Sequence, residues 1–309
     1  MKYIEYGKQC LDTIVLLHGG GLSWWNYEDV ANALQNDYHI ILPILNGHAE
    51  SDKAFTTIEN NAKEIIEYID AHCGGSVLMI GGLSLGGQIL LEILSQRKDI
   101  CQYAVVESTL VRPSKLTYYM IKPAFGSCYG LIKHKWFSAL QFKSLKIKAN
   151  LFEHYFRDTC AISKKDMIAF LQANSLYSLK ESIKECTAKV HIFIGEKENS
   201  SIRKSAVDIH NALPKSTLRV LPKLYHGEFS IKHGNDYAQK IREIISIWQI
   251  PISVSLTVRI FDKVYSNYIK IGICTHYETL GLIHCIKPFF CAFIGVQISY
   301  VQNWIFFIL

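Results

Sequence analysis

Residues 76–91 read SVLMIGGLSLGGQILL, and this stretch limits the possible folds of the chain more than any other. Its first five residues are typical of a buried parallel strand, and the apolar run 89–94 is compatible with a helix. Between them, residues 82–86 match G-x-S-x-G, a sharp strand-to-helix turn with a serine at its apex. Glycines flank the serine because side chains would collide in so tight a turn. We expect Ser84 to stand above the sheet edge, with the N–H of Leu85 directed at developing negative charge.

Apolar runs and helix-compatible segments alternate along most of the chain. Parallel strands joined by helices form a sheet that is covered on both faces. The sequence therefore predicts an α/β fold with a mostly parallel sheet. Strands are expected at 13–17, 38–43, 76–80, 102–106, 189–194 and 217–221, and helices at 28–36, 57–72 and 235–248.

The alternation breaks over residues 112–186, which are rich in Lys, Tyr and Phe and are helical in short pieces. An insertion at this place lies at the carboxyl ends of the strands. We expect residues 1–111 and 187–250 to form the core, and 112–186 to form a helical cap that shapes a substrate pocket.

A serine becomes a good nucleophile only when a histidine accepts its proton and a carboxylate orients that histidine. His226 follows the strand predicted at 217–221, and this position favours it over His233 as the base. Three carboxylates follow neighbouring strands. We favour Glu198, in a loop that enters a helix, over the alternatives Glu196 and Glu107.

Residues 18–21 read HGGG directly after the strand predicted at 13–17. Glycines there let exposed backbone N–H groups approach a ligand closely, as the second oxyanion donor of an acyl-transfer site must. The chain lacks both the phosphate-loop pattern and the dinucleotide fingerprint, which disfavours nucleotide binding.

Composition excludes several other classes of function. A net charge of +6 is too small an excess to indicate nucleic-acid binding. The nine cysteines form no C-x-x-C pair and no metal-spaced set with histidine, so we expect neither a zinc site nor a disulfide framework. No apolar signal segment opens the chain, and the cytoplasm is the expected location.

Residues 251–309 do not continue the pattern. Residues 289–309 carry no charge and are long enough to span a bilayer, but polar Gln297, Gln302 and Asn303 weigh against a membrane anchor. Without clean periodicity, the favoured interpretation is a tail translated out of frame that has no evolved structure. A membrane anchor and an additional domain are the alternatives.

Residues 1–250 resemble the α/β-hydrolase superfamily, and in particular its capped esterases, monoacylglycerol lipases and proline iminopeptidases. The resemblance implies Ser84 as nucleophile, His226 as base and Glu198 as acid. It also implies the backbone N–H groups of Leu85 and Gly20 as oxyanion donors, with Gly21 as the alternate. The matching motifs are HGGG at 18–21, NGH at 46–48, GLSLG at 82–86, GEKE at 195–198 and YHGE at 225–228.

Two positions depart from the family pattern. Many relatives have Asp where this chain has Glu198, and many have Asp where it has Asn46. A glutamate can also orient a histidine, although the change leaves the choice of acid open.

The expected function is hydrolysis of a small ester-type substrate through an acyl-enzyme, without metal or organic cofactor. The same fold supports thioesterase, amidase or peptidase and C–C hydrolase chemistry, and it can also serve as a non-catalytic ligand-binding module.

Overall fold

The computed structural model describes residues 1–213 and 215–246, of which Met1–Ile241 form one compact unit. One seven-stranded sheet runs through this unit in the order β1-β3-β2-β4-β5-β6-β7. Strand β1 is antiparallel to β3, and the other neighbours are parallel. The α/β architecture expected from the sequence is confirmed. The strands are β1 (Lys2–Tyr6), β2 (Thr13–Leu17), β3 (His39–Ile44), β4 (Val77–Leu83), β5 (Cys101–Glu107), β6 (Lys189–Gly195) and β7 (Thr217–Leu221).

Strand β4 lies at the centre of the sheet, between β2 and β5. Ile80 aligns with Val15 on one side and with Ala104 on the other. Every residue of β2 and β4 is buried, as expected for parallel strands covered on both faces. The turn after β4 therefore emerges at the middle of the carboxyl edge of the sheet.

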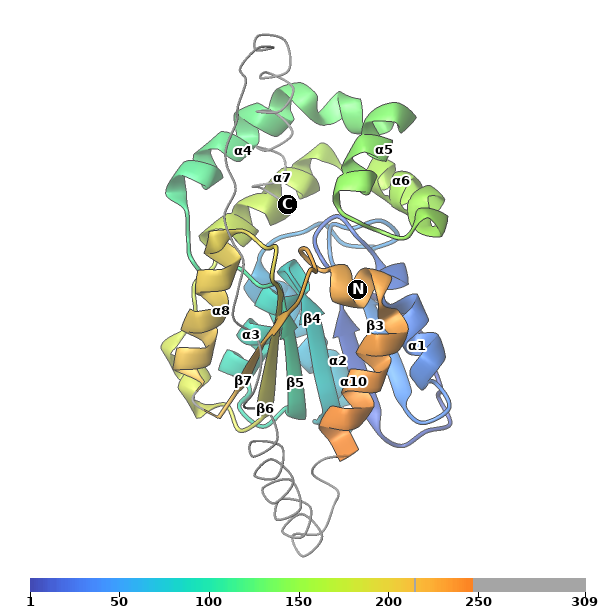
Figure 1. Ribbon diagram of the computed structural model, residues 1–309, viewed down its shortest axis with the longest axis vertical. Coiled ribbons are helices and arrows are strands. Elements are labelled where there is room, and N and C mark those ends of the chain that lie inside the picture. The colour runs from blue at the N-terminus through green and yellow to red at the C-terminus, as the bar shows by residue number, and fades with distance from the viewer. Residues whose placement is uncertain (214, 247–309) are drawn as a thin grey trace, which may run out of the picture. The chain divides into compact units, whose positions relative to one another are not determined.

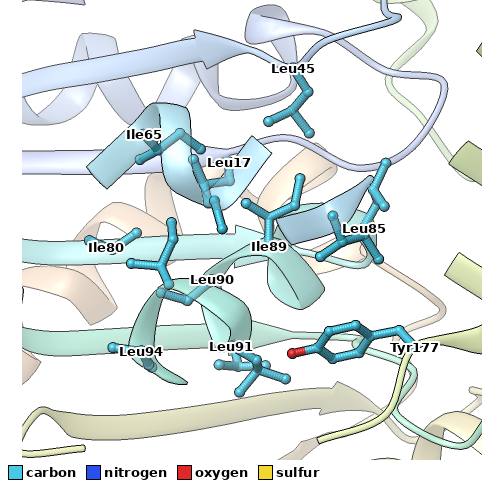
Figure 2. Packing of buried hydrophobic residues seen from close by; sticks show 14 of the residues in the cluster. Leu17, Leu45, Ile65, Ile80, Leu85, Ile89, Leu90, Leu91, Leu94 and Tyr177 are labelled. Carbon is cyan, nitrogen blue, oxygen red and sulfur yellow. The ribbon is translucent and has the colours of Figure 1, made fainter. Parts of the chain in front are cut away.

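Helices cover both faces of the sheet (Figure 1). Helices α2 and α3 pack with α8 and the strands in one apolar cluster, and Figure 2 shows Ile65, Ile80 and Ile89 within it. Helix α1 contributes buried Val30 and Leu34 outside that cluster. The helices of this layer arrangement are η1 (Trp24–Tyr27), α1 (Glu28–Leu34), α2 (Ile58–His72), α3 (Leu85–Gln96), α8 (Ser200–Ala212), α9 (Glu228–Lys232) and α10 (Gly234–Ser246).

The segment between β5 and β6 is helical and lies beyond the carboxyl ends of the strands, at the top of Figure 1. We call residues 112–186 the cap segment. The boundaries 1–111, 112–186 and 187–250 stay predictions. The helices of the cap segment are α4 (Lys115–Cys128), η2 (Tyr129–Lys133), α5 (Lys135–Ser144), η3 (Ala149–Leu151), α6 (Phe152–Ala161), α7 (Lys164–Leu176) and η4 (Glu181–Glu185).

A buried hydrogen bond attaches the cap segment to the rest of the unit. Trp25 Nε1 donates to Asp158 Oδ2 at 2.7 Å, and both residues are buried. Arg157 Nε donates to the other oxygen of the same carboxylate at 2.6 Å. A buried charge needs such partners because water is excluded from it.

Strand β1 and helix α9 were missing from the sequence prediction. Strand β1 is a half-buried edge strand without a long apolar run, and α9 has only five residues. Both are too short or too polar for periodicity to reveal. The helix expected at 235–248 is α10, which begins at Gly234 and is described to Ser246.

The expectations for residues 251–309 lie outside the described residues. Within residues 1–213 and 215–246, no helix is both long and apolar enough to cross a membrane.

Replacement of Trp25 by Phe should destabilise the protein, because it removes the indole donor and leaves the buried Asp158 Oδ2 unpaired. Trp24 is the matched control, since its Nε1 is buried without a partner. We expect Trp25→Phe to cost about 1.5–3 kcal/mol more in unfolding free energy than Trp24→Phe, as measured by urea denaturation. Equal costs would show that the hydrogen bond contributes nothing.

Candidate active site

Ser84 joins β4 to α3 in a strained conformation. Its φ is 52° and its ψ is −110°, a region that residues with a side chain rarely adopt. A Cβ on Gly82 would come within 2.4 Å of the Gly86 carbonyl oxygen, and one on Gly86 within 2.1 Å of the Leu17 carbonyl oxygen. The glycines of GLSLG are therefore required by close backbone approach.

His226 and Glu198 lie together. Nδ1 of His226 is 2.9 Å from Oε2 of Glu198, which fixes the ring with its proton on Nδ1 and leaves Nε2 as the acceptor. The Glu198 side chain is fully buried, whereas that of His226 is 30 % exposed. His226 lines the same cavity as Ser84.

The two alternative carboxylates make other hydrogen bonds. Glu196 accepts a hydrogen bond from the exposed backbone N–H of Lys223 at 2.7 Å. Glu107 accepts from the N–H of Ser230 at 3.2 Å. The structure thus brings Glu198 to His226, as favoured from the sequence, and gives Glu196 and Glu107 other partners.

Opposing effects set the charges of this pair. Burial disfavours the charged form of Glu198, but His226, the Ser108 hydroxyl and the Gly195 N–H outweigh it and hold its pKa below the ordinary value. Burial also disfavours a charged His226, yet the Glu198 carboxylate raises the pKa of the imidazole above its ordinary value. The pair is therefore suited to stabilising an imidazolium when His226 takes up a proton.

Ser108 is a residue of the site that sequence reasoning missed. Its Oγ donates to Glu198 Oε1 at 2.6 Å and accepts from the N–H of Gly227 at 3.1 Å. It thereby connects the carboxylate to the residue that follows His226. The only sequence signal was its place directly after β5, beside the serine turn.

The glycine loop after β2 is held by two buried histidines. His48 Nε2 accepts from the N–H of Gly21 at 3.0 Å, and His18 Nε2 accepts from the N–H of Leu45 at 3.1 Å. Burial lowers the pKa of His48 to about 4, so the ring stays neutral and able to accept. The amide of Gly21 is therefore engaged in the fold.

Gly20 and Leu85 differ from Gly21 in this respect. Within the part of the chain that the structure describes, neither backbone N–H has a hydrogen-bond partner. Gly20 lines the cavity together with Ser84, and Leu85 opens α3 directly after it. Their amides are free to receive an oxyanion.

The cavity in front of Ser84 has a volume of about 50 Å³. Its lining is mostly apolar and comes from both the glycine loop and the cap segment. Because roughly 10–15 Å³ suffices for one water, such a cavity accommodates a group of only a few heavy atoms.

No group of three or more His, Cys, Asp or Glu side chains within residues 1–213 and 215–246 is arranged to hold a metal ion.

The order of strands, with one antiparallel edge and a strained serine after the central strand, defines the α/β-hydrolase fold. Residues 12–126 match the family model described as alpha/beta hydrolase fold. The chain has this fold, and its resemblance to the α/β-hydrolase superfamily is confirmed.

Individual relatives are more distant. Lipase 1 of Psychrobacter immobilis is 30 % identical over 112 residues, which is 35 % of this chain and 35 % of the lipase. The match thus spans about a third of the length of that curated relative.

Solved structures resemble the chain over most of its length. A thermophilic esterase from Thermogutta terrifontis superposes with a TM-score of 0.66 at 15 % identity, covering 79 % of this chain and 92 % of the esterase. The enol-lactonase from Burkholderia xenovorans LB400 gives a TM-score of 0.67 at 13 % identity, covering 79 % and 96 % of the two chains.

Glu107 provides a test of the buried site. Burial raises the pKa of its carboxyl to about 7, from an ordinary value of 4.5. Between these values the unfolded chain releases a proton that the folded chain keeps, so the free energy of unfolding falls as pH rises. A neutral glutamine avoids that loss. We expect the unfolding free energy of Glu107→Gln, measured by urea denaturation relative to that of the parent protein, to be roughly 2–3 kcal/mol higher at pH 8 than at pH 4.

A stability difference that is the same at both pH values would contradict this, since it would mean that Glu107 ionises alike in the folded and unfolded chains.

Proposed function

We propose that this protein is a serine hydrolase that cleaves small carboxylic esters. The observation that carries the proposal is the Glu198–His226 pair at 2.9 Å, whose histidine lines one cavity with the strained Ser84. A carboxylate that orients an imidazole, in the same cavity as a serine, supplies the groups that activation of a hydroxyl nucleophile requires. The lipase and esterase names of its relatives support the same reaction class.

In the proposed first step, His226 Nε2 accepts the proton of Ser84 Oγ while Oγ bonds to the ester carbonyl carbon. The carbonyl oxygen becomes an oxyanion that the N–H groups of Gly20 and Leu85 stabilise. The tetrahedral intermediate then expels the alcohol, which takes the proton from His226. Ser84 is left as an acyl ester, and His226 is neutral again.

In the second step, water gives a proton to His226 Nε2 and attacks the acyl carbon. Collapse of this intermediate breaks the bond to Ser84 Oγ, which recovers its proton, and the carboxylic acid leaves. Glu198 stays ionised throughout and orients the ring, and Ser108 positions Glu198. No cofactor is needed for this sequence of proton transfers.

Thioester, amide and C–C bond cleavage use the same groups, and the choice of ester rests on the relatives' names and on the small cavity. A non-catalytic ligand-binding role remains the alternative from another class. The cytoplasm is the proposed location, because the five described cysteines that are free (Cys10, Cys73, Cys101, Cys160 and Cys186) suit a reducing compartment.

Labelling with a fluorophosphonate tests the proposal directly. The probe should attach covalently to the full-length protein and not to the Ser84→Ala variant, because only an activated serine attacks phosphorus. Circular dichroism of the variant serves as the folding control. Absence of labelling in a folded parent protein would overturn the hydrolase proposal and favour a binding role.

The dependence of kcat/KM on pH tests the assignment of the acid. The base acts only when neutral, so activity should fall as the pH drops through the raised pKa of His226. Glu198→Gln removes the charge that raises this pKa. We expect the acid limb to move to lower pH, and the plateau to fall by about 10³–10⁴-fold.

Glu196→Gln is the matched control, because Glu196 bonds an exposed amide and does not contact His226. The acid limb should stay in place in that variant. A shift caused by Glu196→Gln and not by Glu198→Gln would reverse the assignment.

A further inference from the structure

Besides Ser84 and His226, three polar side chains interrupt the apolar lining of the cavity, and all three come from the cap segment. They are Gln141 on α5, and Tyr155 and Thr159 on α6. The proposed reaction at Ser84 uses none of them.

Two of these side chains are unsatisfied. Thr159 is 5 % exposed, and its Oγ1 is buried without a hydrogen-bond partner in the described residues. Gln141 Oε1 is buried without a partner in the same way. Thr159 lies one helical turn after Tyr155. Burial raises the pKa of the Tyr155 phenol, and the nearby Thr159 hydroxyl opposes part of that rise. The Thr159 hydroxyl nevertheless forms no hydrogen bond of normal geometry in the described residues.

Unpaired buried polar atoms cost about 1–3 kcal/mol each, so proteins seldom contain them without a reason. Ser138 Oγ, also on α5, is buried and paired with the Ile132 carbonyl oxygen at 2.6 Å. His154 Nδ1 and the Tyr177 hydroxyl are buried without a partner in the described residues, but neither residue lines the cavity. Among the described residues of the cap segment with an unpaired buried polar atom, Gln141 and Thr159 are the two that line the cavity containing Ser84. A ligand that hydrogen-bonds to them would recover the lost energy.

The chemistry of the three groups restricts that ligand. An amide oxygen only accepts, so the ligand must donate a hydrogen bond. The threonine and tyrosine hydroxyls donate as well as accept. No Asp, Glu, Lys or Arg side chain is among the described residues that line the cavity, which favours a neutral ligand group. A hydroxyl group meets all these conditions, because it donates and accepts from one atom.

We propose that Gln141, Tyr155 and Thr159 form a hydroxyl-binding subsite, and that the substrate is a short ester with a hydroxyl group on its acyl or alcohol part. This inference rests on the proposed function and narrows it from esters in general to hydroxylated esters. The apolar remainder of the cavity binds the adjoining carbon chain.

Two ester pairs differ in hydroxyl content at the same carbon number. The acyl pair is p-nitrophenyl butanoate and p-nitrophenyl 3-hydroxybutanoate, and the alcohol pair is propyl butanoate and glycerol 1-monobutanoate. Each kcat/KM is divided by the rate at which hydroxide cleaves that ester, which removes the inductive effect of the hydroxyl. We expect the hydroxylated member of at least one pair to be favoured by about tenfold or more.

The variants identify the groups responsible. Thr159→Val and Gln141→Leu keep side-chain size and remove the polar atoms, and each should reduce the preference toward one. Thr159→Ser retains the hydroxyl and should retain the preference. Ile147→Val changes the apolar lining of the same cavity and should leave the ratio unaltered. Equal rates within both pairs, or a preference that survives both polar-to-apolar substitutions, would overturn the subsite.

Binding of the same four esters to the Ser84→Ala variant separates this inference from the proposed function. If the parent protein cleaves none of the esters, yet the variant binds a hydroxylated ester about tenfold more tightly than its partner, the hydrolase proposal fails and the subsite stands. Equal affinities within both pairs would overturn the subsite as well.

Discussion

The strained turn at Ser84 is the constraint on which the rest of the site depends. A residue with φ of 52° and ψ of −110° persists only where its surroundings leave no alternative. Here β4 is buried between two parallel strands, and α3 packs so closely against β2 that a Cβ on Gly86 would lie 2.1 Å from a carbonyl oxygen. The packing of the sheet centre therefore provides the energy that holds the serine at its apex.

Around this turn, the carboxyl ends of four strands supply the other groups. The glycine loop follows β2, Ser108 follows β5, Glu198 follows β6 and His226 follows β7. No one of these loops supplies all the groups of the site. They form a site because parallel neighbours end at the same edge of the sheet. The cap segment closes this edge and supplies most of the side chains that a substrate would contact.

Much of this arrangement could be predicted from particular residues. The runs TIVLL and TLRVL became β2 and β7 with the expected bounds, since strand periodicity is a local property. The turn after β4 was equally predictable, because the need for glycine at 82 and 86 arises within five residues. Strand β1 was not, because its partner β3 lies more than thirty residues away along the chain and its own apolar pattern is weak.

The sequence by itself determined the fold and the place of Ser84, because strand periodicity and turn sterics act between near neighbours in the chain. Only the tertiary structure decided which carboxylate lies beside His226, since Glu196 and Glu198 differ by two residues yet have different partners. It also decided that Ser108 joins the carboxylate, that the Gly21 amide is engaged by His48, and that polar atoms of α5 and α6 line the cavity. Hydrogen bonds are decided within about 3 Å, and chain spacing does not determine distances of that size between residues that lie far apart in sequence.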